Sequence, residues 1–190
     1  MKRLISSVAR VALTFFLVVA GVPALAEGVV VEKSDIRFVA NQLGVNVEGR
    51  FRRFRANVVF RPAALQASRA DIEVDLASVD LASEDSEREV RGAMWFDANH
   101  FPVAKFTSTS FRDLGGGKFQ VAGKFSLKGV TRDVTIPFTL TRDAAGNRIV
   151  ESTFGVKRLD FKVGQGEWGD PDTVADNVVV RVRMVLTPDG

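Results

Sequence analysis

Residues Phe119–Leu140, which read F-Q-V-A-G-K-F-S-L-K-G-V-T-R-D-V-T-I-P-F-T-L, decide the fold class. Over residues 119–127 every second position is apolar or glycine, and this period of two places one face of a β-strand against a core. The pattern breaks at Lys128-Gly129, where glycine can adopt the positive φ of a tight turn. It resumes over residues 134–140. The stretch therefore predicts a long antiparallel hairpin with one apolar face.

The same alternation predicts strands elsewhere in the chain, separated by turn residues. They are Val29–Ala40, Val45–Phe54, Asn57–Arg61, Arg69–Leu76, Val103–Phe111, Arg148–Val156 and Val174–Thr187.

One segment changes period and predicts a short helix over Glu84–Arg91, because Ser83 can cap it and its charges suit the helix dipole. An antiparallel set of eight or nine strands hides its edges when it closes. We therefore predict an all-β, eight-stranded antiparallel barrel with one helix, and a two-sheet sandwich is the alternative. Pro137 cannot donate to a ladder, so we expect it at a bulge or a barrel mouth.

Residues 1–26 have the pattern of a cleaved signal peptide, which leaves residues 27–190 as one domain. Three basic residues precede an apolar run, Val11–Val22, that is too short to span a membrane comfortably, and Ala24-Leu25-Ala26 follows. Cleavage would lower Lys and Arg from 26 to 23, equal to the 23 Asp and Glu. The mature protein is then neutral, which argues against nucleic-acid binding.

The sequence offers little for catalysis or metal binding. His100 is the one histidine and there is no cysteine, so the usual nucleophile–base pairs are nearly absent. Asp170, Asp172 and Asp176 are spaced loosely like calcium ligands but lack the glycine and bidentate Glu of an EF-hand. We therefore predict no catalytic residue, no metal and no cofactor.

Aromatic residues are the strongest candidates for a binding site, because in a barrel the inner face is both core and cavity wall. Small residues in the same register would leave room for a ligand: Gly49, Ala104, Ser108, Gly123 and Ser152. The candidate ligand-binding residues are Phe38, Phe51, Phe60, Trp95, Phe96, Phe101, Phe106, Phe119, Phe125, Phe138 and Phe154.

The run R-F-R-R-F-R, Arg50–Arg55, interleaves arginine with phenylalanine. Arginine binds phosphate oxygens well, so Arg53 and Arg55 are candidates for a ligand's head group. The alternative is a solvated strand end whose charges pair with nearby acids.

Four stretches together resemble the YceI-like family of polyisoprenoid-binding, lipocalin-like periplasmic proteins. They are Gly123–Leu140, F-D-A-N-H-F-P-V-A-K-F-T-S-T (Phe96–Thr109), D-L-A-S-V-D (Asp75–Asp80) and V-K-R-L-D-F-K-V-G-Q-G-E-W (Val156–Trp168). The resemblance implies a periplasmic binding protein that holds an isoprenoid-type lipid, a polyprenyl chain or quinone tail, for transport or storage. By analogy, a membrane b-type cytochrome or a membrane surface is a candidate partner, and a homodimer is a further expectation. The alternatives are an enzyme acting on a lipid and a barrel simply filled by side chains.

Overall fold

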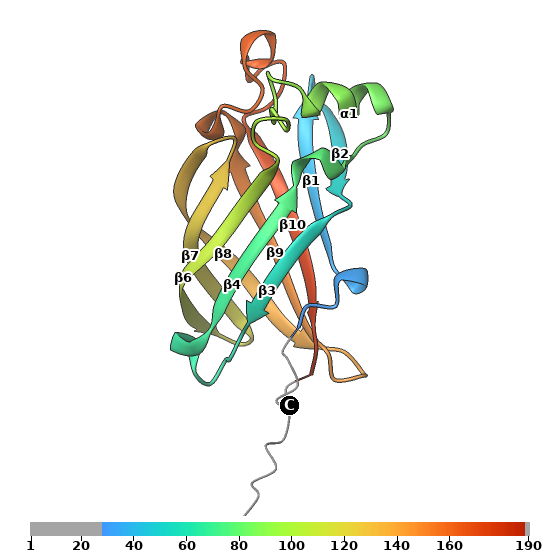
Figure 1. Ribbon diagram of the computed structural model, residues 1–190. Helices are drawn as coiled ribbons and strands as arrows, with labels where there is room; N and C mark the ends of the chain where they lie inside the picture. The colour runs from blue at the N-terminus through green and yellow to red at the C-terminus, as the bar shows by residue number, and fades with distance from the viewer. Residues whose placement is uncertain (1–27, 189–190) are drawn as a thin grey trace, which may run out of the picture.

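The computed structural model describes residues 28–188 and contains, within them, ten strands and one α-helix (Figure 1). The predicted helix is confirmed: α1 spans Glu84–Arg91, and Ser83 Oγ accepts a hydrogen bond from the Ser86 N–H at 3.2 Å. The predicted signal peptide lies outside the described residues. The strands are β1 (Asp35–Gln42), β2 (Val45–Phe51), β3 (Phe54–Val59), β4 (Arg69–Asp75), β5 (Val79–Asp80), β6 (Val103–Gly115), β7 (Lys118–Leu127), β8 (Val130–Arg142), β9 (Arg148–Lys157) and β10 (Asn177–Leu186).

All ten strands belong to one sheet, in the order β3-β4-β6-β7-β8-β9-β10-β1-β2-β5, and every neighbouring pair is antiparallel. The sheet curls around one interior, with α1 at one end (Figure 1). The fold is therefore all-β, as predicted, and it is one curved sheet rather than two packed sheets.

The predicted number of eight strands is not confirmed, because two long strands are interrupted at the same level. Arg52 and Arg53 separate β2 from β3, and the 3-10 turn Leu76–Ser78 separates β4 from β5. At this level the Arg52 N–H donates to the Ser78 carbonyl at 3.0 Å and the Asp75 N–H to the Arg53 carbonyl at 3.1 Å. Along the chain, β3 follows β2 and β5 follows β4. The two ends of the sheet order, β3 and β5, therefore lie next to each other at this level.

The central hairpin is confirmed in its register. β7 and β8 pair from Lys118 opposite Thr139 to Leu127 opposite Val130, and a two-residue turn joins them. Both turn residues have positive φ, 47° at Lys128 and 74° at Gly129, as a type I′ hairpin turn requires.

Pro137 marks the place where the β8–β9 ladder stops. These strands pair only from Thr139 opposite Glu151 to Arg142 opposite Arg148, although both extend further. Proline has no N–H to donate to the ladder, and the Pro137 carbonyl instead accepts from Ser152 Oγ at 2.6 Å. Beyond this point the facing edges of β8 and β9 share no ladder, so the wall of the sheet has a seam here.

Several strand boundaries differ from the prediction, among them the starts of the first and last strands. The first strand begins at Asp35 rather than Val29, because Val31–Lys33 form a 3-10 turn whose end is closed by the Ser34 N–H. The last begins at Asn177 rather than Val174, whose N–H is taken by the Asp170 carbonyl at 3.1 Å.

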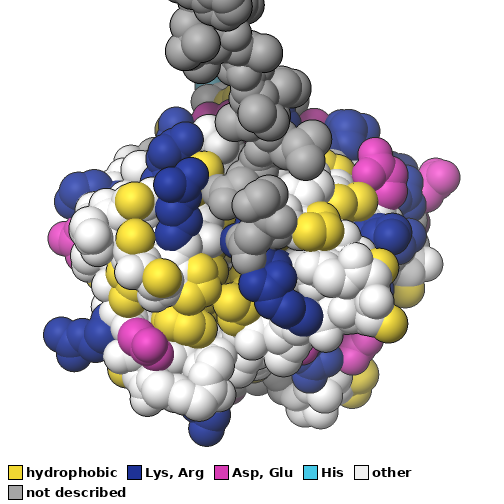
Figure 2. Space-filling model, turned by 90° about the horizontal axis from the view of Figure 1, so that it is seen from below, with side chains coloured by type: hydrophobic (Ala, Val, Ile, Leu, Met, Phe, Trp, Pro, Cys, Tyr) yellow, Lys and Arg dark blue, Asp and Glu magenta, His cyan; other side chains and the backbone are white. Residues whose placement is uncertain are grey.

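An aromatic cluster fills the end of the interior that lies away from α1. The Phe60 ring lies 5.0 Å from that of Phe119 and 5.2 Å from that of Phe138, both edge to face, and Phe111 packs against Phe60 at 5.6 Å. Phe60 and Phe119 are buried. Seen from below, the outside of this end carries apolar side chains between basic and acidic ones (Figure 2). The described core therefore closes one end of the curved sheet.

Candidate functional site: an apolar cavity

A cavity of about 670 Å³ occupies the interior between the aromatic cluster and α1. Its wall is mainly apolar, and valines of β10, Val178, Val180 and Val182, form one side of it. On α1, Asp85, Ser86, Glu89 and Val90 border it. The volume lies in the range of about 300–1,000 Å³ that small-molecule sites occupy. The cavity thus has a closed aromatic end and an end bordered by polar groups.

Nine of the eleven predicted aromatic residues line this cavity, whereas Phe101 and Phe119 do not. Phe119 is buried in the closed end, where its ring stacks on that of Phe138 at 5.5 Å. Phe101 is 37% exposed and packs over Gly129. Ligand binding by these side chains stays a prediction. The nine that line the cavity are Phe38, Phe51, Phe60, Trp95, Phe96, Phe106, Phe125, Phe138 and Phe154.

The expectation that glycines leave room for a ligand is wrong, because aromatic rings already occupy the space above them. A Cβ on Gly123 would lie 2.6 Å from the Phe106 ring and 2.5 Å from the Thr107 carbonyl. At Gly49 it would meet the rings of Phe38 and the side chain of Leu81. These glycines therefore allow the rings to approach the strands closely. Of the other small residues proposed, Ala104 and Ser152 line the cavity.

Arg53 and Arg55 lie on the outer side of the sheet and do not line the cavity. Their side chains are 65% and 86% exposed and lie 2.9 Å from Asp75 and 3.7 Å from Glu73, respectively. This placement matches the alternative of a solvated strand end paired with acids. Contact with a ligand's head group would require that group to reach the outer surface.

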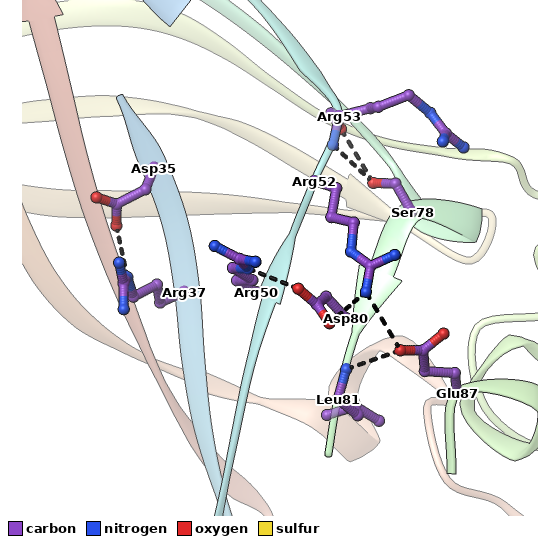
Figure 3. A network of polar contacts seen from close by, with 9 residues as sticks. All are labelled: Asp35, Arg37, Arg50, Arg52, Arg53, Ser78, Asp80, Leu81 and Glu87. Carbon is purple, nitrogen blue, oxygen red and sulfur yellow. Dashed lines mark hydrogen bonds and ion pairs between the residues drawn. The ribbon is translucent and has the colours of Figure 1, made fainter. Parts of the chain in front are cut away.

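The neighbouring arginines join a polar network that connects α1 to the sheet (Figure 3). Arg50 and Arg52 each approach an oxygen of Asp80 at 2.6 Å, and Arg52 lies 3.9 Å from Glu87. Hydrogen bonds from Arg52 and then Arg50 lower the pKa of Asp80 far below its usual value. The Leu81 N–H donates to Glu87 of α1 at 3.2 Å. These polar contacts fix α1 to the sheet at this end of the cavity.

A buried arginine, which the sequence did not single out, organises the glycine-rich segment after β9. Arg158 is 3% exposed, and its guanidinium donates to five main-chain carbonyls at 2.6–3.2 Å. Burial lowers its pKa. Gly164 has φ 72°, and a Cβ there would collide with the guanidinium. The acceptors belong to Val163, Gly164, Trp168, Val174 and Ala175.

Lys128 of the hairpin turn is a second buried cation. Its Nζ donates to the Ala93 carbonyl at 2.8 Å and the Lys162 carbonyl at 2.9 Å, and burial lowers its pKa. It therefore ties the α1–β6 connection and the segment after β9 to the β7–β8 hairpin. The sequence offered one signal for the special role of Lys128: it precedes Gly129 in a turn where Asn or Asp is the usual residue.

His100 lies outside the cavity. Its side chain is 77% exposed, and Nδ1 lies 2.8 Å from Asp97 Oδ1. Within residues 28–188, no three His, Asp or Glu side chains gather as a metal ion would require. In the same residues, no helix has the length and apolar character needed to cross a membrane.

The curved sheet and its interior define an all-β protein with a largely apolar cavity. The model of the YceI-like domain matches residues 29–186, so the chain belongs to the YceI-like family.

Several relatives are similar to this chain. Burkholderia cenocepacia BcnA, a solved structure, is 37% identical, with a TM-score of 0.79 over 83% of this chain and 98% of that chain. A structure described as a polyisoprenoid binding domain from Saccharophagus degradans, implicated in plant cell wall breakdown, has a TM-score of 0.68 at 19% identity, covering 86% and 99%, and supports the fold alone. A Vibrio vulnificus UPF0312 protein is 34% identical over 104 residues, 54% of this chain and 55% of its own length. The match thus spans about half the length of such curated relatives.

Proposed function

We propose that the protein binds one isoprenoid-type lipid, a polyprenyl chain or quinone tail, inside this cavity. The observation that carries the proposal is the 670 Å³ cavity with its aromatic and valine wall. Each methylene that leaves water contributes about 0.8 kcal/mol, so a branched hydrocarbon tail would bind well without specific polar contacts. The Saccharophagus degradans domain, which is described as polyisoprenoid binding, shares this fold.

The polarity of the wall suggests the direction in which the lipid lies. The Phe60–Phe119–Phe138 end is closed and apolar, whereas α1 brings Asp85, Ser86 and Glu89 to the other end. A diphosphate or quinone head would lose several kcal/mol if buried without partners. The tail therefore points toward the aromatic end and the head lies beside α1, where the carboxylates of Asp85 and Glu89 favour a quinone over a diphosphate.

The role that we infer is transport or storage of this lipid in the periplasm, on a lipocalin-like fold. Periplasmic location follows from the predicted signal peptide. Partnership with a membrane b-type cytochrome and formation of a homodimer stay predictions. An enzymatic role gains no support from His100, which is solvent-exposed and does not line the cavity. His100→Ala is accordingly expected to retain lipid binding.

Two measurements on exported protein test the proposal. Organic extraction followed by mass spectrometry should release an isoprenoid-type lipid. A polyprenyl lipid added to stripped protein at 100 times its Kd should stabilise it by about 2.7 kcal/mol, or roughly 5–10 °C in Tm.

A charge on the cavity wall provides the negative control for both measurements. Phe125→Asp should lose the lipid, and His100→Ala should keep it. The absence of any extracted lipid, together with an unchanged Tm on lipid addition, would refute the proposal.

A further inference from the structure

Most of the large exposed apolar side chains lie at one end of the molecule. Of seven such residues among those described, five belong to the β1–β2 turn, the first residue of β2, the α1–β6 connection or the first residue of β6. These five are Leu43, Val45, Met94, Phe101 and Val103. We call the most exposed three, Leu43, Val45 and Met94, the apolar rim; they are 72%, 66% and 49% exposed.

The apolar rim borders the end of the cavity that lies beside α1. Gln42 and Val174, which form a β-bridge next to Leu43, both line the cavity. The Leu43 N–H donates to the Thr173 carbonyl at 3.0 Å, so the turn is fixed to this edge. On the other side, Met94 precedes Trp95, a cavity-lining residue. The apolar surface of the rim thus adjoins the apolar wall of the cavity.

The conformation of Leu43 is unfavourable for the isolated protein. Leu43 and Gly44 form a two-residue turn with φ of 49° and 83°, both positive. Asn or Asp before glycine is the usual choice in such a turn, and a leucine with positive φ is uncommon. Its side chain gains little within the chain, because it is 72% exposed. An unfavourable backbone that presents an apolar side chain to solvent indicates contact with something outside the molecule.

We propose that the apolar rim inserts into the surface of a lipid bilayer, so that the cavity faces the membrane from which the lipid is taken. This inference rests on the proposed function. A bilayer is favoured over a protein partner because the rim adjoins the end of the cavity at which a membrane lipid would enter. The mixed charges of α1, with Glu84, Asp85 and Glu87 in its first turn and Arg88 and Arg91 in its last, provide no single sign of potential. Binding should therefore depend on apolar contact and change little with salt.

The chain offers a matched control at its opposite end. Val31 and Leu114 are 42% and 52% exposed and lie in the 3-10 turn before β1 and near the β6–β7 turn. The double variant Leu43→Asp/Val45→Asp removes two apolar groups at the rim, and Val31→Asp/Leu114→Asp removes two at the closed end. Flotation with phosphatidylethanolamine–phosphatidylglycerol vesicles should show at least ten-fold weaker binding for the rim variant only.

A single substitution separates docking from folding. Leu43→Asn suits the turn and should keep or raise the Tm, while it weakens vesicle binding. Equal flotation of wild type, rim variant and control variant would overturn the inference. So would gel filtration showing that wild type is a dimer and the rim variant a monomer, since a second copy would then cover the rim. Because lipid extraction from purified protein tests the proposed function separately, a rim variant that floats normally and still carries lipid refutes the docking alone.

Discussion

Replacing Arg158 tests whether one buried guanidinium holds the segment that follows β9. Its five N–H groups meet five carbonyls, and a methionine would fill similar space but leave all five without this donor. At about 1 kcal/mol net for each hydrogen bond, Arg158→Met should cost about 5 kcal/mol. For a domain of this size that lowers the Tm by roughly 10–20 °C.

Urea unfolding followed by circular dichroism measures this loss, and two variants calibrate it. Arg158→Lys keeps the charge but has only three N–H groups, so about 2 kcal/mol should be lost. Arg88→Met, at an exposed pair with Asp85, should change stability by less than about 0.5 kcal/mol. An Arg158→Met protein within 1 kcal/mol of wild type would show that the five carbonyls find water or other donors, and the reasoning would fail.

Three further predictions concern other parts of the sheet. Gly123→Leu should prevent folding or lower stability severely, as measured by circular dichroism, because its Cβ would lie 2.5 Å from the Thr107 carbonyl. Asp80→Asn should be less stable than wild type at neutral pH; the lowered pKa of Asp80 stabilises the fold above about pH 4, so the difference in Tm should shrink as pH falls below that. At the seam, alternate amides in residues 131–135 and 153–157 should exchange hydrogen faster than amides of the β7–β8 ladder; equal protection would refute an open seam.

The features that could be predicted from the sequence are those that depend on neighbours along the chain. Alternation over residues 119–140 placed each side chain of the hairpin on its correct face, and Ser83 with the charges around it located α1 to the residue. The break between β2 and β3 was predicted at residues 55–56 and lies instead at Arg52-Arg53, because residue types in the run Arg50–Arg55 do not show where one strand ends. Only the position of the 3-10 turn on the opposite strand explains that break.

The buried cations were missed for a different reason. Arg158 and Lys128 bind main-chain carbonyls, which every residue has, so their partners leave no signature of residue type. A carboxylate partner would have been visible as a charge pattern, as it was for the arginines that meet Asp75, Glu73 and Asp80.

The sequence showed which aromatic residues face the interior, but it did not show how much space lies between them. A period of two shows which phenylalanines point inward, but whether a ring covers a glycine depends on the rotamer and on the neighbouring strand. Phe106 lies over Gly123 and Phe38 over Gly49, so neither glycine contributes free volume. The open volume instead lies against the valines of β10, which are only partly buried although they face inward. If the cavity binds a lipid tail as proposed, substitutions at Val180 or Val182, rather than at the glycines, are therefore the ones that should change which tail it accepts.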